Sequence, residues 1–424
     1  MRYLVLFLFF LSVNVAASVP VYVPIGSNTS LGGYANRQSL ETSLSNPAAS
    51  YLMTPINNFR VGFLGPLDFG LEIGDVKGIE DKASDLSDKL EADYTTEAEI
   101  NAALAEVNAS LTSLESDAYV KVYGSLQAPF APIIYKTRNR GAFSVDASAS
   151  FVARLGLIAD DVSVVNTGSD FNFESNSSVI IKRATDYRFG VGYSQLVGRP
   201  VSGALIVGGK VNLHRMALGQ KISVLSDGDG DESLSMSYIF DRDYVDSGIG
   251  IDLGAIWAAP NYQLGATVAN VNEPEFKFKK LGDCSGLSGS ELNACNVAIN
   301  LANKDKLTLK ETYKKKAQLT VDAAIMSVNQ NWSLAGSFDV NSIAGPLGDK
   351  YQWSTVSISH FSDNVFFPGI RIGYRKNHAG SQLSYITGGL TLSRRLNFDL
   401  AYGLETAGST PRSVSFSLGY AFAF

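Results

Sequence analysis

The last twelve residues of the chain, 413–424, most constrain its fold, because large and small side chains alternate there without interruption. The even positions from Val414 to Phe424 are bulky and apolar, and the odd positions from Ser413 to Ala423 are serine, glycine or alanine. A period of two gives a strand one apolar face and one slim face. A membrane-spanning strand needs about 9–11 residues, whereas soluble strands run about 5–6. The segment therefore predicts the closing strand of a transmembrane β-barrel, with its apolar face in lipid and its slim face against a packed lumen.

The N-terminus indicates export. Arg2 precedes an apolar run over residues 4–15, and Ala16 and Ala17 offer a cleavage point before Ser18. This arrangement is typical of a secretory signal peptide, which we assign to residues 1–17. No stretch of about 18 apolar residues follows it, so membrane-spanning helices are excluded.

The same alternation recurs from residue 118 to the C-terminus, with turn residues between the segments. We expect about 12–14 antiparallel strands, with 14 favoured, because a bacterial barrel whose two ends lie on one side has an even number. In a soluble sandwich the charged positions would face water and the apolar face would form the core. Here the apolar face is too uniform over too many strands for one sandwich. The charges opposite it are expected in the lumen, where they either line a pore or, as we favour, pair with one another: Arg188, Lys210, Asp252, Arg371, Arg375 and Asp399.

Residues 77–117 interrupt the strand pattern with helical spacing. Apolar residues recur every three or four positions in two runs, Ile79 to Leu90 and Ile100 to Leu114, which is the seam of two helices. Thr96 and Glu99 form a capping box at the start of the second run. We predict an acidic, antiparallel helical hairpin inserted into the barrel. The apolar residues of this seam pack the two helices against each other or, alternatively, bind a partner helix.

The remaining chemistry is sparse. Cys284 and Cys295 are the two cysteines, and their close spacing in an exported chain predicts a loop disulfide; a metal pair, the alternative, lacks further ligands. The basic run Lys314 to Lys316 is expected at the solvated end of a strand. With a net charge of −6 and three scattered histidines, the sequence predicts neither a nucleic-acid-binding protein nor an enzyme, and no metal site or cofactor.

Two family resemblances appear in the sequence. The segment 32–49, with its Asn-Pro-Ala turn, resembles the N-terminal hatch of FadL-type long-chain fatty acid channels, which lies inside a barrel of 14 strands. The resemblance implies that residues 18–58 form a luminal plug. It also implies that Asn46, Pro47 and Ala48 shift when a hydrophobic substrate enters.

More of the chain resembles the barrel-type conjugal-transfer TraF family. The shared features are the Asn-Pro-Ala segment, the acidic hairpin, and the segments 247–257, 268–276 and 368–375. This resemblance implies a role in plasmid transfer. The Cys284–Cys295 loop departs from the family pattern.

The C-terminus also resembles the signal by which outer-membrane barrels are recognised for insertion. The polar-x-Gly-x-x-apolar-x-aromatic pattern places Gly419, Phe422 and Phe424 at its key positions. The implied location is the outer membrane of a Gram-negative cell. The implied partners are its lipid and the barrel assembly machinery.

Three functional hypotheses follow for a chain made of the plug and a barrel over residues 59–424. The first is a passive channel for small hydrophobic compounds. The alternative is a closed structural or interaction barrel, in which the hairpin and long loops bind partners of unknown identity, including partners in conjugation. A soluble, secreted β-sandwich is the third hypothesis, and the long uniform apolar faces weigh against it.

Overall fold

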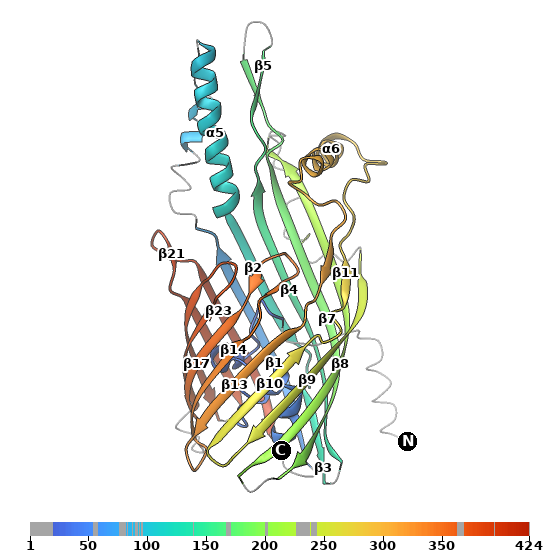
Figure 1. The fold of residues 1–424 in the computed structure, drawn as a ribbon, viewed down its shortest axis with the longest axis vertical. Helices are drawn as coiled ribbons and strands as arrows, with labels where there is room; N and C mark the ends of the chain where they lie inside the picture. Colours follow the sequence, from blue (N-terminus) through green and yellow to red (C-terminus); the bar gives the residue numbers. More distant parts are fainter. Residues whose placement is uncertain are drawn as a thin grey trace.

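The computed structural model describes residues 20–53, 58–75, 82, 84–86, 88–89, 92, 94, 96–138, 140–166, 171–199, 202–225, 238, 244–362, 369–393 and 395–423. In this part of the chain, an antiparallel sheet closes into a tall barrel with helices and long strands at one end (Figure 1). The predicted signal peptide and Phe424 lie outside the described residues. In the described residues, no helix is both long and apolar enough to cross a membrane.

The barrel wall follows the chain order. Its strands are β1 (Phe59–Ile73), β2 (Tyr119–Gln127), β3 (Ile133–Thr137), β4 (Gly141–Ile158), β7 (Ser178–Gly198), β8 (Ala204–Val224), β9 (Asp246–Ala258), β10 (Tyr262–Ala269), β13 (Gln318–Met326), β14 (Trp332–Asp339), β17 (Trp353–His360), β18 (Gly369–Asn377), β19 (Ser384–Leu392), β20 (Leu396–Gly403) and β23 (Ser413–Ala423). Shorter strand pairs decorate the loops: β5 (Ser163–Asn166) with β6 (Phe171–Glu174), β11 (Glu275–Lys277) with β12 (Thr312–Lys314), β15 (Ile343–Ala344) with β16 (Lys350–Tyr351), and β21 (Thr406–Ala407) with β22 (Thr410–Pro411).

The first and last strands close the barrel. Phe69 of β1 pairs with Phe416 of β23 in antiparallel register. β2 and β3 both pair with β1 on one side and with β4 on the other. Together they occupy a single strand position in the wall, and residues 128–132 separate the two strands. The described wall therefore has 14 strand positions, which confirms the predicted number.

Burial alternates along the strands as the sequence predicts. On β23, Phe416 and Leu418 are 40% and 39% exposed, whereas Ser415 and Ser417 are 6% and 2% exposed. Aromatic and aliphatic side chains form the same exposed outer face on the other strands. Because this apolar belt surrounds a closed barrel, its natural environment is a lipid bilayer.

The two ends of the barrel differ in their connections. The wall strands are joined by short segments at one end, around residues 140, 200, 260 and 330, and we call it the short-turn end. At the opposite, long-loop end lie the helical insertion and the connections over 159–177, 225–245 and 270–317. β1 is a full strand, so the hairpin shares the long-loop end with the other large insertions (Figure 1).

The described half of the helical hairpin is α5 (Glu97–Asp117), and its N-terminus has the predicted capping box. The Thr96 hydroxyl accepts from the Glu99 N–H, and the Glu99 carboxylate accepts from the Thr96 N–H. Val107 and Leu111 pack against residues that follow β4 and against Leu86 of the preceding segment. Of that segment, Ile79, Ala83 and Leu90 lie outside the described residues.

The long-loop end rises above the rest of the wall because β4, β7 and β8 contain 18, 21 and 21 residues. The second long helix, α6 (Gly289–Asn303), covers the inner face of this extension. Val297 and Leu301 of α6 pack against Ile222 and Val224 of β8. Beyond the apolar belt, α6 thus covers the apolar inner surface of the extended strands.

The N-terminal segment folds inside the barrel as a series of single turns. These are α2 (Asn28–Leu31), η2 (Leu40–Leu44), η3 (Pro47–Ala49) and α3 (Ser50–Met53). Most of their residues are buried, and they contact strands on opposite sides of the wall, including β8, β9 and β18. We call residues 20–53 the hatch.

Candidate functional site

The Asn-Pro-Ala turn joins the hatch to the wall. Asn46 caps η3, because its side-chain oxygen accepts from the Ala48 N–H at 2.9 Å. Pro47 occupies the first position of η3. A backbone N–H at that position has no partner within the helix, so proline, which lacks the N–H, costs no hydrogen bond there. The Asn46 amide also donates to the carbonyls of Ala255 and Ala266, at 3.4 and 3.3 Å. One side chain therefore shapes the turn and fastens it to β9 and β10.

Two glycines make the seat for this turn. A Cβ on Gly208 of β8 would lie 2.6 Å from both the Pro47 carbonyl carbon and the Ala48 nitrogen. A Cβ on Gly254 of β9 would lie 2.9 Å from Cδ of Pro47. The hatch backbone can approach the wall this closely because neither position carries a side chain.

A second set of contacts holds the hatch to other wall strands, β20 and β1. Glu41 is 2% exposed and accepts from the Asn397 amide of β20 at 2.7 Å. Ser30 donates to Asp399 at 3.3 Å, and the Gly26 N–H donates to Asp68 of β1 at 2.9 Å. These polar contacts join buried groups, and breaking them without replacement costs free energy.

The six charges singled out in the sequence lie on inner faces of the wall and are buried. Arg371 and Asp399 form a fully buried ion pair, with 2.9 Å between Nη2 and Oδ2. Lys210 pairs with Asp146 of β4. Arg188 approaches Asp252 only to 3.8 Å, and Arg375 lies 3.9 Å from the centre of the Trp353 ring. Within the described lumen, then, the cations are mostly paired or stacked.

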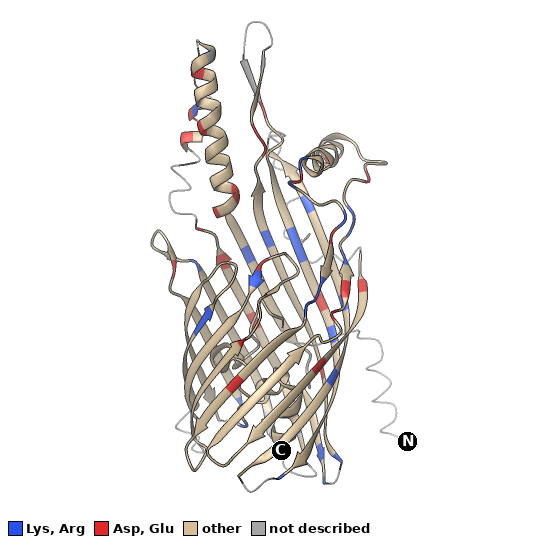
Figure 2. Cartoon of the chain, viewed as in Figure 1, with Lys and Arg blue, Asp and Glu red and all other residues tan. Residues whose placement is uncertain are grey.

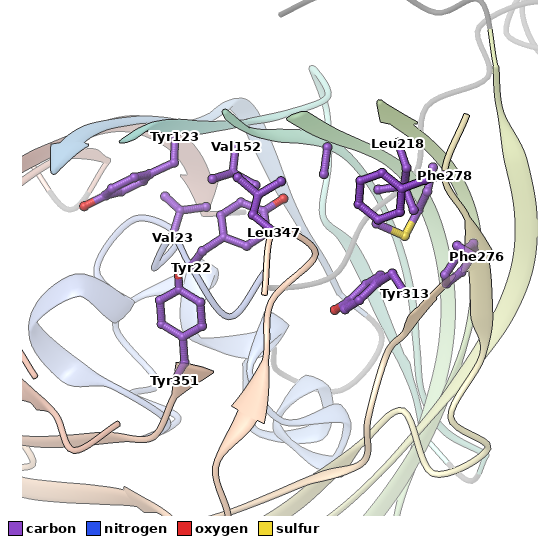
Figure 3. Close-up of a cluster of buried hydrophobic side chains, with 12 residues drawn as sticks. Tyr22, Val23, Tyr123, Val152, Leu218, Phe276, Phe278, Tyr313, Leu347 and Tyr351 are labelled. Atoms are coloured by element: carbon purple, nitrogen blue, oxygen red, sulfur yellow. The ribbon is translucent and has the colours of Figure 1, made fainter. Parts of the chain in front are cut away.

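Above these charges an apolar cluster joins hatch, wall and loops. Tyr22 and Val23 of the hatch meet Met216 and Leu218 of β8 and side chains from the loops after β10 and β14, among them Phe276, Tyr313 and Leu347 (Figure 3). We call the loop segment 270–317 the lid, because its Phe276 and Tyr313 enter the mouth of the barrel. The Tyr22 hydroxyl bonds Ser150 of β4 at 3.0 Å, which fixes the hatch beneath the lid.

A cavity of about 70 Å³ lies at this junction. Its apolar lining includes Tyr22, Met216 and Tyr313, and its polar lining includes Asp186 and Asp252. Below it, a second apolar cluster around Ala48, Ala49, Met53 and Ile206 fills the space between the hatch and the wall. The small amphipathic cavity therefore lies beside the first apolar cluster, and the second apolar cluster joins the hatch to the wall.

A comparison with protein families identifies the family of this chain. The profile of the family described as "F plasmid transfer operon, TraF, protein" matches residues 43–339. This chain belongs to that family. No curated protein matches the chain.

Solved structures similar to this TraF-family chain have low sequence identity to it, and they include a hydrocarbon channel, a toluene transporter and a FadL homologue. The CymD monoaromatic hydrocarbon channel is 12% identical, with 96% of this chain and 99% of that chain covered and a TM-score of 0.47. The toluene transporter TodX of P. putida is 12% identical, with 97% and 99% covered and a TM-score of 0.43. A Pseudomonas aeruginosa FadL homologue is 11% identical, with 96% and 99% covered and a TM-score of 0.42.

One buried constellation of this TraF-family barrel was not singled out from the sequence. His214 Nδ1 lies 2.9 Å from Asp186, and Lys315 Nζ lies 3.1 Å from the same carboxylate. The expectation that Lys314 to Lys316 mark a solvated strand end is wrong for Lys315, which is 8% exposed. It follows the inward Tyr313 at the same lid edge, so the period of two carries it into the lumen. This alternation was the signal in the sequence that could have placed Lys315 in the lumen.

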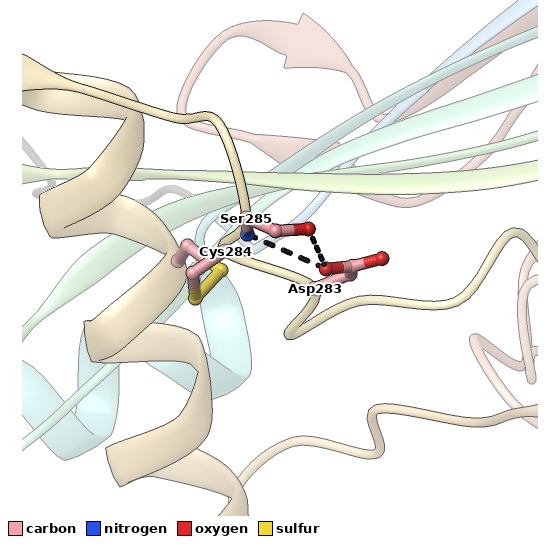
Figure 4. The surroundings of a disulfide bond; sticks show 4 residues. Asp283, Cys284 and Ser285 are labelled. Atoms are coloured by element: carbon pink, nitrogen blue, oxygen red, sulfur yellow. Dashed lines mark hydrogen bonds between the residues drawn. A yellow bond between two sulfur atoms is a disulfide. The ribbon is translucent and has the colours of Figure 1, made fainter.

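The predicted disulfide is present, and it joins Cys284, which precedes α6, to Cys295 within α6 (Figure 4). Beside it, the Ser285 hydroxyl donates to Asp283 at 2.6 Å and orders the turn that leads into the bridge. The described residues include no group of three or more His, Cys, Asp or Glu positioned to hold a metal ion. Within the lid, the bridge links the turn before α6 to the helix itself.

Proposed function

We propose that this chain is an outer-membrane barrel of a Gram-negative cell, and that its lumen is a gated passage for small hydrophobic compounds. The observation that carries the proposal is the cavity where hatch, wall and lid meet, lined on one side by Tyr22, Met216 and Tyr313. A hydrophobic solute gains free energy by leaving water for such a surface. Residues of both the lid and the hatch line this cavity.

The gate in this proposal is the predicted plug, residues 18–58, whose described part is the hatch; Asn46, Pro47 and Ala48 lie at its contact with the wall. Its elements are turns of three to five residues, and side-chain bonds rather than a strand ladder attach it to the barrel. Such a segment can shift without breaking the wall. Entry of a solute beneath the lid would compete for the space that Tyr22 and Val23 fill.

Uptake into liposomes tests this proposal. Purified protein in liposomes should accelerate entry of a fluorescent aromatic probe and leave entry of a sugar of similar size unchanged. A variant without residues 20–53 should admit both. Failure of the barrel to admit the aromatic probe, with the hatch present or removed, would overturn the proposal.

A second candidate function rests on the long-loop end. α5 projects beyond the wall, and residues 76–118 carry 11 acidic residues against three lysines (Figure 2). A closed barrel that presents this acidic hairpin to a protein partner, in plasmid transfer as the family description suggests, is consistent with that shape. Replacing residues 77–117 with a short glycine-serine linker should then abolish mating while the barrel still folds. Unchanged mating efficiency would count against it.

Assembly and sidedness are part of the same proposal. Insertion by the barrel assembly machinery would use Gly419, Phe422 and Phe424; Gly419 lies on the buried face of β23, and the side chain of Phe422 is not described. Long connections lie outside the cell in bacterial barrels. Added protease should therefore cleave the hairpin on intact cells. Cleavage only after the outer membrane is opened would reverse the orientation.

A further inference from the structure

Tyr22 of the hatch places a phenol beside the cavity. The residue is 6% exposed and belongs to the apolar cluster that also contains Val152 and Met216 (Figure 3). Its hydroxyl bonds the Ser150 hydroxyl of β4 at 3.0 Å. The interior of the barrel therefore already holds a para-substituted phenol, with an apolar surface for the ring and a hydrogen-bond partner for the oxygen.

The wall side chains beside Tyr22 form one row across three strands. Ser150 of β4 lies opposite Asp186 of β7, and Asp186 lies opposite Met216 of β8. All three residues are buried. Because opposite residues of antiparallel strands have Cβ atoms about 4.5–5.5 Å apart, the Asp186 carboxylate is the immediate neighbour of the hydroxyl that Tyr22 bonds.

The charges around the cavity favour a neutral ligand. Asp186 and Asp252 both line it. Lys315 lines it as well, but its Nζ already pairs with Asp186 at 3.1 Å. An anionic ligand would have to compete with Asp186 for this lysine, and a buried charge without a partner is costly. The connection over residues 226–243, at the same end of the barrel, contains six acidic residues against one arginine, so its net charge also disfavours an anion.

Entry of an aromatic ring requires Tyr22 to move. The cavity has a volume of about 70 Å³, whereas a cavity that binds benzene in another protein has about 150 Å³. Residues 20–27, which carry Tyr22, form turns and bends rather than a helix or strand. Trp353 Nε1 donates to the Val21 carbonyl at 2.9 Å and holds this segment. Tyr22 can therefore leave its place without disturbing the ladder of the wall.

We propose that the preferred ligand of this passage is a neutral phenol with a single ring, which takes the place of the Tyr22 side chain and bonds Ser150. The proposal rests on the passage proposed above and names its ligand. An aromatic hydrocarbon would fill the same apolar space but leave the Ser150 hydroxyl without the bond that Tyr22 supplies. A benzoate would bring a carboxylate beside Asp186. A phenol, whose ordinary pKa is about 10, brings a hydroxyl and no charge.

Fluorine NMR of the purified full-length protein in detergent tests the proposal, with protein-free micelles as the reference. The probes are 4-fluorophenol, fluorobenzene and 4-fluorobenzoate, which share one ring and differ in the polar group. We expect 4-fluorophenol to bind about tenfold more tightly than fluorobenzene, and 4-fluorobenzoate to bind most weakly. The variant Y22A removes the internal competitor and should strengthen binding of both neutral probes.

The variant S150A tests the hydrogen bond. Both neutral probes displace Tyr22, so the ratio of their affinities does not depend on how easily the hatch moves. In S150A this ratio should fall to one or below. Ser148 is buried on the same face of β4, two residues away, so S148A is the matched control and should keep the wild-type ratio. Heat resistance of the folded barrel on gels checks that each variant is folded.

An unchanged ratio in S150A would overturn the phenol proposal, as would an equal fall in S148A or benzoate binding as tight as that of the phenol. These results are distinct from failure of the passage itself. If both neutral probes bind equally and Y22A strengthens both, the passage stands and only the preference for phenols is wrong. If neither neutral probe binds to the wild type or to Y22A, the passage for hydrophobic compounds is wrong as well.

Discussion

Gly208 of the wall lies so close to Pro47 of the hatch that even a methyl group does not fit between them. A Cβ at position 208 would be 2.6 Å from the Pro47 carbonyl carbon and 2.7 Å from its oxygen. The neighbouring Gly209 faces outward, and a Cβ there would meet Leu253 at 3.6 Å, an ordinary contact. A side chain at position 208 would therefore clash with the hatch, whereas a side chain at position 209 would fit.

Replacing Gly208 with alanine should displace the Asn-Pro-Ala turn from the wall. Overpacking of this kind costs about 1–3 kcal/mol, and we expect the hatch to absorb it because its attachments are few. Amide exchange over residues 48–53 should accelerate, and uptake of the aromatic probe should rise. Gly209→Ala is the matched control, with the same added methyl group and an expected wild-type phenotype. Identical uptake by both variants would argue against a hatch gate at this turn.

The Arg371–Asp399 pair offers a test of what the buried charges contribute. Changing Arg371 to methionine leaves Asp399 without its cation, and uncompensated buried charge costs about 3–5 kcal/mol. Urea unfolding of the barrel in detergent should report this loss. The double variant R371M/D399L removes both charges and should recover much of the stability. A double variant as unstable as the single one would place the loss in packing rather than charge.

The barrel wall could be predicted because every strand that crosses a lipid bilayer must present an apolar face to the lipid. The alternation from Val414 to Phe424 predicts both its outward and inward faces, and the same pattern elsewhere gives 14 strands. The capping box at Thr96 was predictable because it depends on residues three apart. The disulfide was predictable because an exported chain with two neighbouring cysteines offers one intramolecular pairing.

The lumen contacts could not be predicted in the same way. Alternation turns Asp186 and His214 toward one side, yet it does not reveal that they are neighbours, because that depends on the register of β7 against β8. Lys315 reaches them from 101 residues beyond His214, through the fold of the lid. Likewise, the Asn-Pro-Ala motif identifies a turn, and only the closed barrel brings it against Gly208.

The disulfide should stabilise α6 locally. The bridged cysteines are 11 residues apart, and closing a loop of that size contributes about 2–3 kcal/mol. In the variant C284S/C295S we expect faster amide exchange over residues 289–303, with β20 unchanged as the internal control. Reduction of the wild type should reproduce the effect. Equal protection of α6 with and without the bridge would show that its packing on β8 suffices.

Asp160 should make docking of α6 depend on pH. Its carboxylate lies just past the end of β4 and accepts from Lys304 Nζ at 2.7 Å, while Lys306 Nζ lies 3.6 Å away. Burial alone would raise the pKa of Asp160, but hydrogen bonds from Lys304 and Asn176 and the lysine charges outweigh it, so the pKa is lowered. A lowered pKa means that the folded state favours the carboxylate. The stabilisation is therefore complete above the ordinary aspartate pKa and is lost as the pH falls through the lowered value.

Proteolysis after lysine, with a protease active over the range, and amide exchange of α6 between pH 7 and about 3 would measure this loss. In the variant D160N, α6 should be weakly protected at every pH, because the amide cannot pair with Lys304. The adjacent Asp161 is exposed, so D161N is the matched control and should keep the wild-type pH dependence. If D160N keeps that dependence as well, another titrating group must hold α6, and the ion pair at Lys304 would be incidental to the docking of the lid.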